Sequence, residues 1–300
     1  MKILITGSNG LLGQKLVEAL RKDPTIELVA TSRGGDRTPR PLGDRYRPMD
    51  ITQQAAVEAV FSDVRPDVVI HTAAMTNVDA CELDHAACTL QNVVATGHLI
   101  KAAERCQSHF IFLSTDFIFD GLNGPYRETD VPAPLSYYGQ SKLDGERMLS
   151  ASKLDRWAIA RTIIVYGVAE GLSRSNVVLW AKAALEKGSP INVVDDQWRM
   201  PTLAEDLADG CIRIAKQGAT GIYHLSGPDG MSILELVQRV ARYFGLDASI
   251  ATRISSDRLG QPAQRPPRTG FILEKARTEL GYAPRSFEEG LAVLSTRMRS

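Results

Sequence analysis

The sequence lacks the features that define several large classes of protein. No run approaches the ~18 apolar residues that a transmembrane helix needs. Only four apolar or weakly polar residues follow Lys2 before Gly7, which is too short for the apolar core of a secretory signal. The chain also contains no internal repeat and no low-complexity tract. We therefore expect a cytoplasmic protein that does not associate with membranes.

Charge excess, disulfide patterns and metal-ligand spacings are missing as well. Lysine plus arginine number 35 and aspartate plus glutamate number 35, whereas a dedicated nucleic-acid-binding protein normally shows a basic excess. The four cysteines form no CxxC pair and no zinc-finger spacing, which indicates free thiols in a reducing compartment. His71 and His224 lie in strand-like segments, where a core position is expected, and the other histidines make no ligand spacing. The sequence thus predicts no catalytic metal and no nucleic-acid partner.

What the sequence does contain is an alternation of short apolar segments with helical patterns. Strand-like runs occur at 2–6, 27–32, 67–71, 109–114 and 157–165. Helical patterns lie between them at 10–22, 52–61, 79–106 and 136–152, and residues 34–48 are typical of a loop. Strands that alternate with helices predict a parallel sheet with crossover helices, and near-continuous apolar strands fit a sheet buried on both faces. We predict an α/β fold with a Rossmann-like, doubly wound parallel sheet over residues 1–165.

After residue 166 the alternation is less regular. Helical patterns occur near 175–187, 203–216, 231–244 and 286–298, with short strands near 191–194 and 221–225. This composition predicts a smaller, mixed C-terminal lobe over residues 166–300.

A glycine-rich turn joins the first strand to the first helix. It reads GSNGLLG over residues 7–13. Glycines there let the turn close tightly and let a pyrophosphate approach the backbone, and the helix N-terminus offers free N–H groups. The context predicts a dinucleotide site, and a plain glycine-rich turn is the alternative. The candidate cofactor contacts are Gly7, Asn9, Gly10, Leu11, Leu12 and Gly13.

The end of the second strand bears on the choice of cofactor. An acidic residue there would bind the ribose 2′-hydroxyl of NAD, whereas an arginine favours the 2′-phosphate of NADP. The chain has Arg33 and no acid before Asp36, so we expect NADPH and leave NADH open. Asp50, with Ile51 beside it, follows a further short strand and is a candidate adenine contact. The alternatives are a solvated loop position for Arg33 and a helix cap for Asp50.

Tyr138 and Lys142 form a YxxxK motif in the fourth helical pattern. Residues i and i+4 share one face of a helix, and an ammonium beside a phenol lowers the pKa of the phenol toward the working range. The preceding strand ends near Thr115, at the edge where parallel sheets hold their sites, so its hydroxyl can bind a substrate carbonyl. Thr115, Tyr138 and Lys142 are the predicted catalytic residues. Tyr137 is a weaker candidate because Ser141, not a lysine, follows it by four positions.

These motifs resemble those of the extended short-chain dehydrogenase/reductases, and within that superfamily those of the dTDP-4-dehydrorhamnose reductases. The similar stretches keep one order along nearly the whole chain, and the block 114–146 is the most specific. They are GSNGLLG (7–13), HTAAMTNVDACE (71–82), STDFIFDG (114–121), PYRETDVPAPLSYYGQSKLDGE (125–146), RTIIVYG (161–167), DDQWRMPT (195–202), DLA (206–208) and RPPRTGFILEKARTELGY (265–282).

The resemblance implies roles for individual residues. Thr115, Tyr138 and Lys142 match the catalytic triad of the family, in which the tyrosine protonates the new alkoxide and the lysine also holds the nicotinamide ribose. The loop after residue 71 would contact the cofactor through Ala73, Ala74 and Thr76, and the substrate through Val78 and Asp79. The C-terminal lobe would bind substrate, with a return of the chain to the Rossmann part near 191–216.

A substrate of this family carries a diphosphate. Three arginines in C-terminal loops, Arg199, Arg265 and Arg268, are candidates to clamp it through bidentate contacts, and exposed surface arginines are the alternative. Asn176 matches an asparagine at the entry to the substrate lobe of the family, and a helix cap is its alternative. The chain departs from the family at Ile164, where an aromatic residue is usual, and at Trp198–Met200.

The resemblance implies reduction of the 4-keto group of a nucleotide-linked 6-deoxy sugar, with dTDP-4-dehydro-L-rhamnose as the expected substrate. Two alternatives stay open. One is a nucleotide-sugar epimerase or dehydratase, although Phe117 stands where dehydratases usually carry a second acid. The other is a non-catalytic regulatory subunit that resembles the β-subunit of methionine adenosyltransferase. The expected partner is the nucleotide sugar, and a homodimer is compatible with either case.

Overall fold

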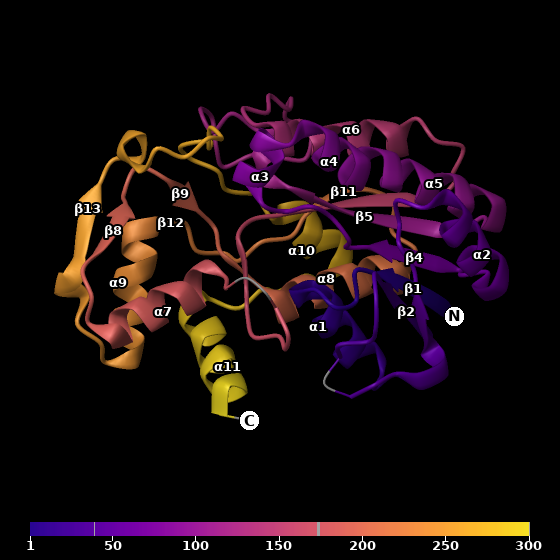
Figure 1. Cartoon of the computed structure of the whole chain (residues 1–300), viewed down its shortest axis with the longest axis horizontal. Helices are drawn as coiled ribbons and strands as arrows, with labels where there is room; N and C mark the ends of the chain where they lie inside the picture. The colour runs from indigo at the N-terminus through magenta and orange to yellow at the C-terminus, as the bar shows by residue number, and fades with distance from the viewer. Residues whose placement is uncertain (39, 173–174, 300) are drawn as a thin grey trace.

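The centre of the computed structural model is a parallel sheet of seven strands (Figure 1). The structure describes residues 1–38, 40–172 and 175–299. The strands follow the order β11 (Gly221–His224), β6 (Trp157–Thr162), β5 (His109–Thr115), β4 (Val68–His71), β1 (Lys2–Thr6), β2 (Glu27–Ser32) and β3 (Tyr46–Pro48). The order reverses between β1 and β4, which is the switch point of a doubly wound sheet. The predicted Rossmann-like α/β fold is therefore confirmed.

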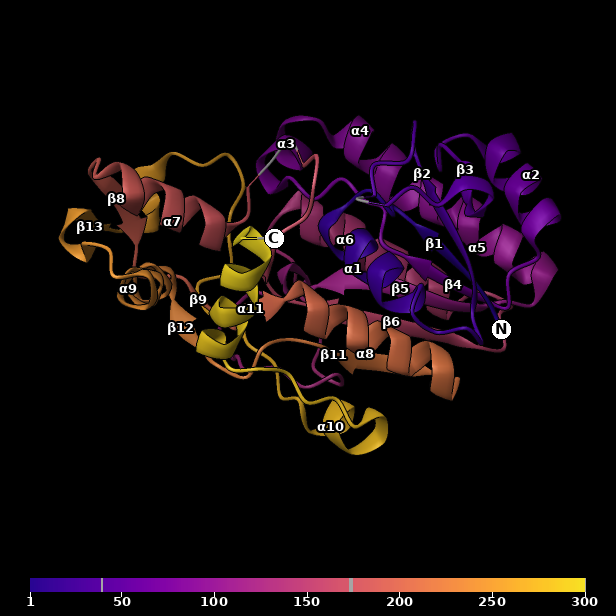
Figure 2. The same ribbon diagram turned by 90° about the horizontal axis from the view of Figure 1, so that it is seen from below.

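Helices cover both faces of the sheet, as Figure 2 shows. Successive strand residues point to opposite faces, and both sets are apolar here. Ile3 and Ile5 of β1 pack with α1 (Leu11–Leu20), α8 (Ala204–Gln217) and α10 (Glu274–Leu280). Leu4, between them, packs with α2 (Gln54–Val64), α5 (Ala95–Cys106) and the end of α6 (Tyr137–Ser150). The sheet is thus buried from both sides, and its polar chemistry is confined to the strand ends.

The helical pattern at 79–106 folds as consecutive pieces and not as one helix. They are α3 (Val78–Leu83), α4 (His85–Thr89), the π-helical turn η2 (Leu90–Val94) and α5. Asp84 separates the first two because its φ of −136° is not helical, and its side chain accepts a hydrogen bond from Ala87 N at 2.9 Å. The expected loop at 34–48 also contains structure, since it holds η1 (Gly43–Arg45) and the edge strand β3.

A smaller lobe, at the left of Figure 1, is formed mainly by residues after 165. Its core joins Val178 of α7, Val240 of α9 and Leu291 of α11. Its helices are α7 (Val177–Lys187), α9 (Ile233–Phe244) and α11 (Phe287–Arg299), with the short turns η4 (Ala248–Ile250) and η5 (Ser256–Leu259). Its short strands are β7 (Val165–Tyr166), β8 (Ile191–Val194), β9 (Trp198–Arg199), β10 (Thr202–Leu203), β12 (Met231–Ser232) and β13 (Ala251–Ile254).

The chain crosses between the two lobes more than once. β8, expected to begin the return to the sheet at residue 191, instead pairs with β13 inside the smaller lobe. The return is made by α8 and β11, because the apolar residues Leu207 and Ile214 of α8 bury against the sheet. α10 then rejoins the same face late in the chain. Across the described residues, every helix is too short or too polar to cross a membrane.

Candidate active site

The glycine-rich turn lies at the carboxyl end of β1, beside the switch point. Gly7 has a φ of +72°, and a Cβ there would lie 2.7 Å from Ala73 N. A Cβ on Gly13 would lie 2.2 Å from Gly7 O, so neither position has room for a side chain. Gly10 precedes Leu11 and Leu12 at the start of α1, and no side chain caps that helix. The turn therefore leaves the N-terminus of α1 to bind an anion such as a pyrophosphate.

Two polar residues near this turn are already engaged within the chain. The Asn9 amide donates to Gly35 O at 2.9 Å and accepts from Arg37 N at 2.9 Å, so it holds the loop after β2. Asp50 accepts from Thr52 N at 3.0 Å and from its hydroxyl at 2.7 Å, and these bonds lower the pKa of Asp50. Asp50 thus closes a turn before α2, while Gln53 is the N-cap. Ile51, next to it, is half-buried against the core below α2.

In contrast to Asn9 and Asp50, the side chain at the end of β2 is exposed to solvent. Arg33 follows the last residue of β2 and is exposed. No acidic side chain occupies that strand end, where one would be required to bind the ribose 2′-hydroxyl of NAD. The geometry leaves Arg33 accessible to a phosphate at this edge.

The loop after β4 lies directly against the glycine-rich turn. Thr72 Oγ1 donates to Thr6 O at 2.6 Å, which places Ala73 beside Gly7, and Ala74 follows in the loop. His71, at the end of β4, is held between Thr6 Oγ1 at 2.7 Å and a threonine of α5, and burial lowers the pKa of His71 to about 3. It is neutral and internal, as expected for a core histidine. Thr76, farther along the loop, is exposed.

Thr115, Tyr138 and Lys142 come together where β5 ends and α6 begins. Ser136 caps α6 by accepting from Gly139 N at 3.2 Å, which sets Tyr138 in the first turn. The Thr115 hydroxyl, at the last position of β5, lies within hydrogen-bonding reach of the Tyr138 phenol. Lys142 follows one turn later, is buried, and its Nζ lies 4.0 Å from the centre of the Phe112 ring.

Burial controls the ionisation of the two helical residues. It raises the pKa of Tyr138, and the hydrogen bond with Thr115 opposes this rise only in part. Burial also lowers the pKa of Lys142 to about 7. The expected fall in the pKa of the phenol is therefore not found, because desolvation of Tyr138 raises it. A neutral phenol is nonetheless the form that can donate a proton.

Asn92 is a site residue that the sequence reasoning missed. It is buried in the π-helical turn, where its Oδ1 accepts from Met75 N at 2.8 Å. Its Nδ2 donates to Met75 O and to Ser141 Oγ, both at 3.0 Å. Asn92 thus ties the loop after β4 to the catalytic helix α6. The available signal was a polar residue inside the long helical pattern, since π-helical turns are frequent at functional sites.

Tyr137, the weaker candidate for the acid, faces another way. Its ring stacks on His85 with the ring centres 3.7 Å apart, and its hydroxyl lies 2.6 Å from Thr89 Oγ1. Its phenol is therefore used in packing α6 against α4.

The arginines expected to bind substrate in the C-terminal lobe differ in exposure: Arg199 is buried, whereas Arg268 is exposed. Arg199 is 2% exposed, and its guanidinium donates to the carbonyls of Pro266 at 2.7 Å and Pro267 at 3.4 Å. This contradicts the expectation of an open clamp for a diphosphate, since the donors already hold the backbone. Arg268 is exposed and lies over the ring of Trp198, 5.7 Å from its centre.

Arg265 and Asp79 join the two lobes. Arg265 Nη2 lies 2.7 Å from Asp79 Oδ2, and Asp79 Oδ1 also accepts from Ala263 N at 3.3 Å. Asp79, with Val78, starts α3 after the β4 loop, whereas Arg265 belongs to the C-terminal loop. The ion pair therefore joins two segments that are far apart in the sequence.

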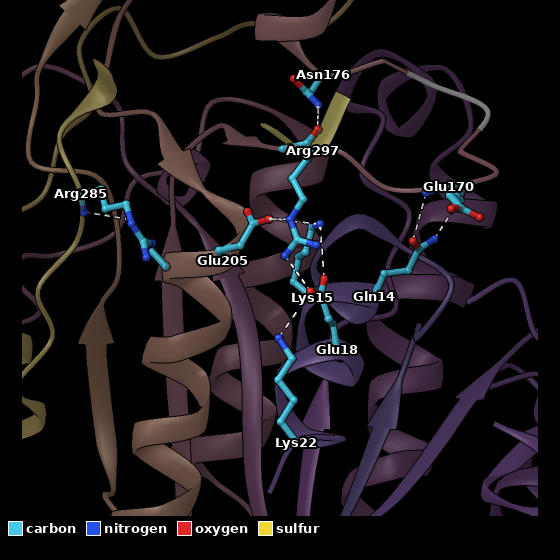
Figure 3. Close-up of polar contacts among 11 residues, drawn as sticks. Gln14, Lys15, Glu18, Lys22, Glu170, Asn176, Glu205, Arg285 and Arg297 are labelled. Atoms are coloured by element: carbon cyan, nitrogen blue, oxygen red, sulfur yellow. Dashed lines mark hydrogen bonds and ion pairs between the residues drawn. The ribbon is translucent and has the colours of Figure 1, made fainter. Parts of the chain in front are cut away.

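Asn176 caps α7, which was the alternative stated for it. Its Oδ1 accepts from Leu179 N at 3.1 Å. Its Nδ2 donates to Gly167 O at 2.7 Å, which is the contact drawn at Asn176 in Figure 3. Both ends of the amide are thus used by the local backbone.

Figure 3 also shows that α1, which begins at the glycine-rich turn, is tied to the smaller lobe. Gln14 donates to Glu170 O at 2.8 Å and accepts from Glu170 N at 3.0 Å. Arg297 of α11 lies 2.7 Å from Glu18 of α1 and 3.5 Å from Glu205 of α8. These contacts hold the C-terminal helix against the helix that the predicted cofactor would contact. No grouping of side chains suited to a metal ion occurs among the described residues.

A family model described as the RmlD substrate binding domain matches residues 1–300 of the chain. The chain belongs to this family. A solved dTDP-4-dehydrorhamnose reductase from Bacillus anthracis, in complex with NADP, is 27% identical with a TM-score of 0.84 over 99% of each chain. The resemblance to dTDP-4-dehydrorhamnose reductases, within an extended short-chain dehydrogenase/reductase fold, is thus confirmed.

Curated relatives of this RmlD-type chain carry two kinds of name. Methionine adenosyltransferase 2 subunit beta from Xenopus laevis is 33% identical over 264 residues, which cover 86% of this chain and 77% of the relative. The probable low-salt glycan biosynthesis reductase Agl14 from Haloferax volcanii is 30% identical over 298 residues, which cover 98% and 97%. The family is therefore clear, while the similarity extends both to reductases and to an adenosyltransferase subunit.

Proposed function

We propose that this protein is a reductase that uses a nicotinamide cofactor to reduce the 4-keto group of a nucleotide-linked 6-deoxy sugar. Its substrate is dTDP-4-dehydro-L-rhamnose and its preferred cofactor is NADPH. The observation that carries the proposal is the placement of Thr115 at the carboxyl end of β5 and of Tyr138 and Lys142 in the first turns of α6. The similarity to a solved dTDP-4-dehydrorhamnose reductase in complex with NADP supports the substrate and the cofactor.

The residues at the switch point fit a dinucleotide. Gly7 and Gly13 form a cradle that a Cβ would fill, and the uncapped N-terminus of α1 opens onto it. We assign the pyrophosphate to this turn, the 2′-phosphate to Arg33 and the nicotinamide side to Ala73, Ala74 and Thr76. When bound, the cofactor supplies the hydride.

The protein's own contribution is proton transfer and orientation. Tyr138, kept neutral by burial, donates its phenolic proton to the oxygen that becomes the alcohol. Lys142 is close enough to neutrality at pH 7 to exchange a proton, and it is positioned one helical turn from the phenol. Arg268, which is exposed, supplies the positive charge near the diphosphate, since Arg199 is engaged with backbone carbonyls and Arg265 is paired with Asp79.

The test is turnover with dTDP-4-dehydro-L-rhamnose made in situ, followed by the loss of reduced-nicotinamide absorbance with NADPH and NADH offered separately. Tyr138→Phe should lower kcat by about 10²- to 10⁴-fold, the range expected for loss of a general acid. Tyr137→Phe is the matched control and should retain activity, because its phenol faces Thr89. Bound cofactor without turnover would refute the rhamnose assignment.

A second candidate function is a regulatory subunit that binds the cofactor without turning over a substrate. The 33% identity to methionine adenosyltransferase 2 subunit beta favours it. Co-purification with a methionine adenosyltransferase, and an unchanged partner activity in Tyr138→Phe, would support this candidate over the reductase.

A further inference from the structure

A buried carboxylate links the catalytic threonine to the C-terminal lobe. Asp116 directly follows Thr115 and is 1% exposed. Its Oδ1 accepts from Thr115 Oγ1 at 3.2 Å. Its Oδ2 accepts from Thr269 Oγ1 and lies 3.8 Å from Arg199 Nε. Burial raises the pKa of Asp116, while the guanidinium and the two hydroxyls oppose that rise.

This arrangement uses both carboxylate oxygens inside the protein. Asp116 therefore has no free oxygen for a substrate, which does not suit a role as proton donor. It also commits the single hydroxyl proton of Thr115, whose oxygen additionally accepts from Phe117 N at 3.2 Å. With its proton on Asp116, the Thr115 hydroxyl is not a donor to the ketone oxygen, which leaves the Tyr138 phenol as that donor.

The hydroxyl that donates to Asp116 Oδ2 belongs to the C-terminal segment, defined here as residues 266–269. Arg199 fixes the carbonyls of Pro266 and Pro267 in that segment. The segment also packs on the loop after β5 without spare room, because a Cβ on Gly121 would lie 2.8 Å from Pro266 Cβ. The hydroxyl of Thr269 is thus presented to Asp116 by a segment that is far away in the sequence.

We propose that Asp116 is a positioning residue that fixes the orientation of the Thr115 side chain at the carboxyl end of β5. Thr269, presented by the C-terminal segment, holds Asp116 in that position. The orientation of the catalytic threonine therefore depends on the seating of the smaller lobe. This inference rests on the proposed reductase function, in which Thr115 and Tyr138 share the site of ketone reduction.

The kinetic test removes the hydroxyl that holds Asp116. Thr269→Val should lower kcat between about 5- and 100-fold, as misplacement near a reacting group does, with KM within about twofold. Thr269→Ser keeps the donor and should restore kcat. In a Thr115→Val background, Thr269→Val should change kcat by less than about twofold, because its effect passes through Thr115. The inference would be overturned if Thr269→Val lowered kcat in the Thr115→Val background by the same factor as in the wild type. It would also be overturned if Thr269→Ser did not restore kcat.

A matched control distinguishes loss of Thr115 positioning from the general effect of removing a buried hydroxyl. Thr202 is buried and donates to Ile163 O at 2.6 Å, and no contact joins its hydroxyl to Asp116. Thr202→Val should lower Tm and leave kcat unchanged. An equal loss of kcat in this control would show that the effect of Thr269→Val is only structural.

A readout without substrate keeps the two proposals apart. The methyl NMR signal of Thr115, assigned by its absence in Thr115→Val, reports the orientation of that side chain. It should shift in Thr269→Val and keep its wild-type position in Thr269→Ser and Thr202→Val. If the wild-type protein reduces no 4-keto nucleotide sugar, the proposed function fails, and this signal alone decides the inference. An unchanged Thr115 signal in Thr269→Val would refute it.

Discussion

Replacing Glu146 by glutamine should destabilise the protein by about 3–5 kcal/mol, the cost of leaving a buried charge without its partner. The two side chains of the ion pair are 3% exposed at Arg161 and 5% exposed at Glu146. Arg161 Nε donates to Glu146 Oε1 at 3.0 Å and Nη2 donates to Oε2 at 2.7 Å, so the contact is bidentate. A glutamine keeps the shape and one acceptor but removes the charge that compensates the guanidinium.

Calorimetry measures the effect as a fall in Tm of roughly 6–20 °C, from about 2–4 °C per kcal/mol for a chain of this size class. The double variant Glu146→Met with Arg161→Met should lie closer to the wild type than the single variant, because no buried charge is left unpaired. A Tm for Glu146→Gln within about 2 °C of the wild type would refute this reasoning. Glu146 also raises the pKa of Lys142, so the same variant should shift any Lys142-dependent pH profile toward acid.

Three further predictions concern the predicted cofactor and catalytic residues. Gly13→Ala should abolish NADPH binding in a fluorescence titration, since its Cβ would lie 2.2 Å from Gly7 O, whereas Gly230→Ala, with 3.8 Å to its nearest neighbour, should bind normally. Lys142, with a pKa of about 7, is cationic below that pH and neutral above it. If the ammonium is required, kcat/KM should fall above pH 7, and a flat profile to pH 9 would contradict this. Arg33→Asp should raise KM for NADPH about tenfold or more and leave that for NADH unchanged or lower, and equal effects on both would remove Arg33 from cofactor choice.

Local patterns were sufficient for the elements that carry the site. The apolar strand 2–6, the glycine-rich turn after it and the helix that follows are neighbours in sequence, so their geometry depends on short-range sterics and backbone hydrogen bonding. Tyr138 and Lys142 share a helix face because the helical repeat places them four residues apart. The family resemblance along the chain added the expected sugar chemistry, which no local pattern determines.

Tertiary packing decided the parts that depend on contacts between distant residues. Arg199 and Asn176 look available in the sequence, but burial against the 266–267 carbonyls and capping of α7 engage them. Asn92 joined the site only because a π-helical turn brings it between Met75 and Ser141.

The same division applies to ionisation and to the path of the chain. The YxxxK spacing places Tyr138 and Lys142 four residues apart in α6, yet the depth of burial, which sequence does not encode locally, decides that the pKa of Tyr138 rises. β8 pairs with β13 because both strands pack on the core of the smaller lobe. Their distance along the sequence gives no local signal for this pairing. Periodicity therefore determined the secondary structure and the catalytic face, whereas desolvation and long-range hydrogen bonding, which exist only after folding, determined how each polar side chain is used.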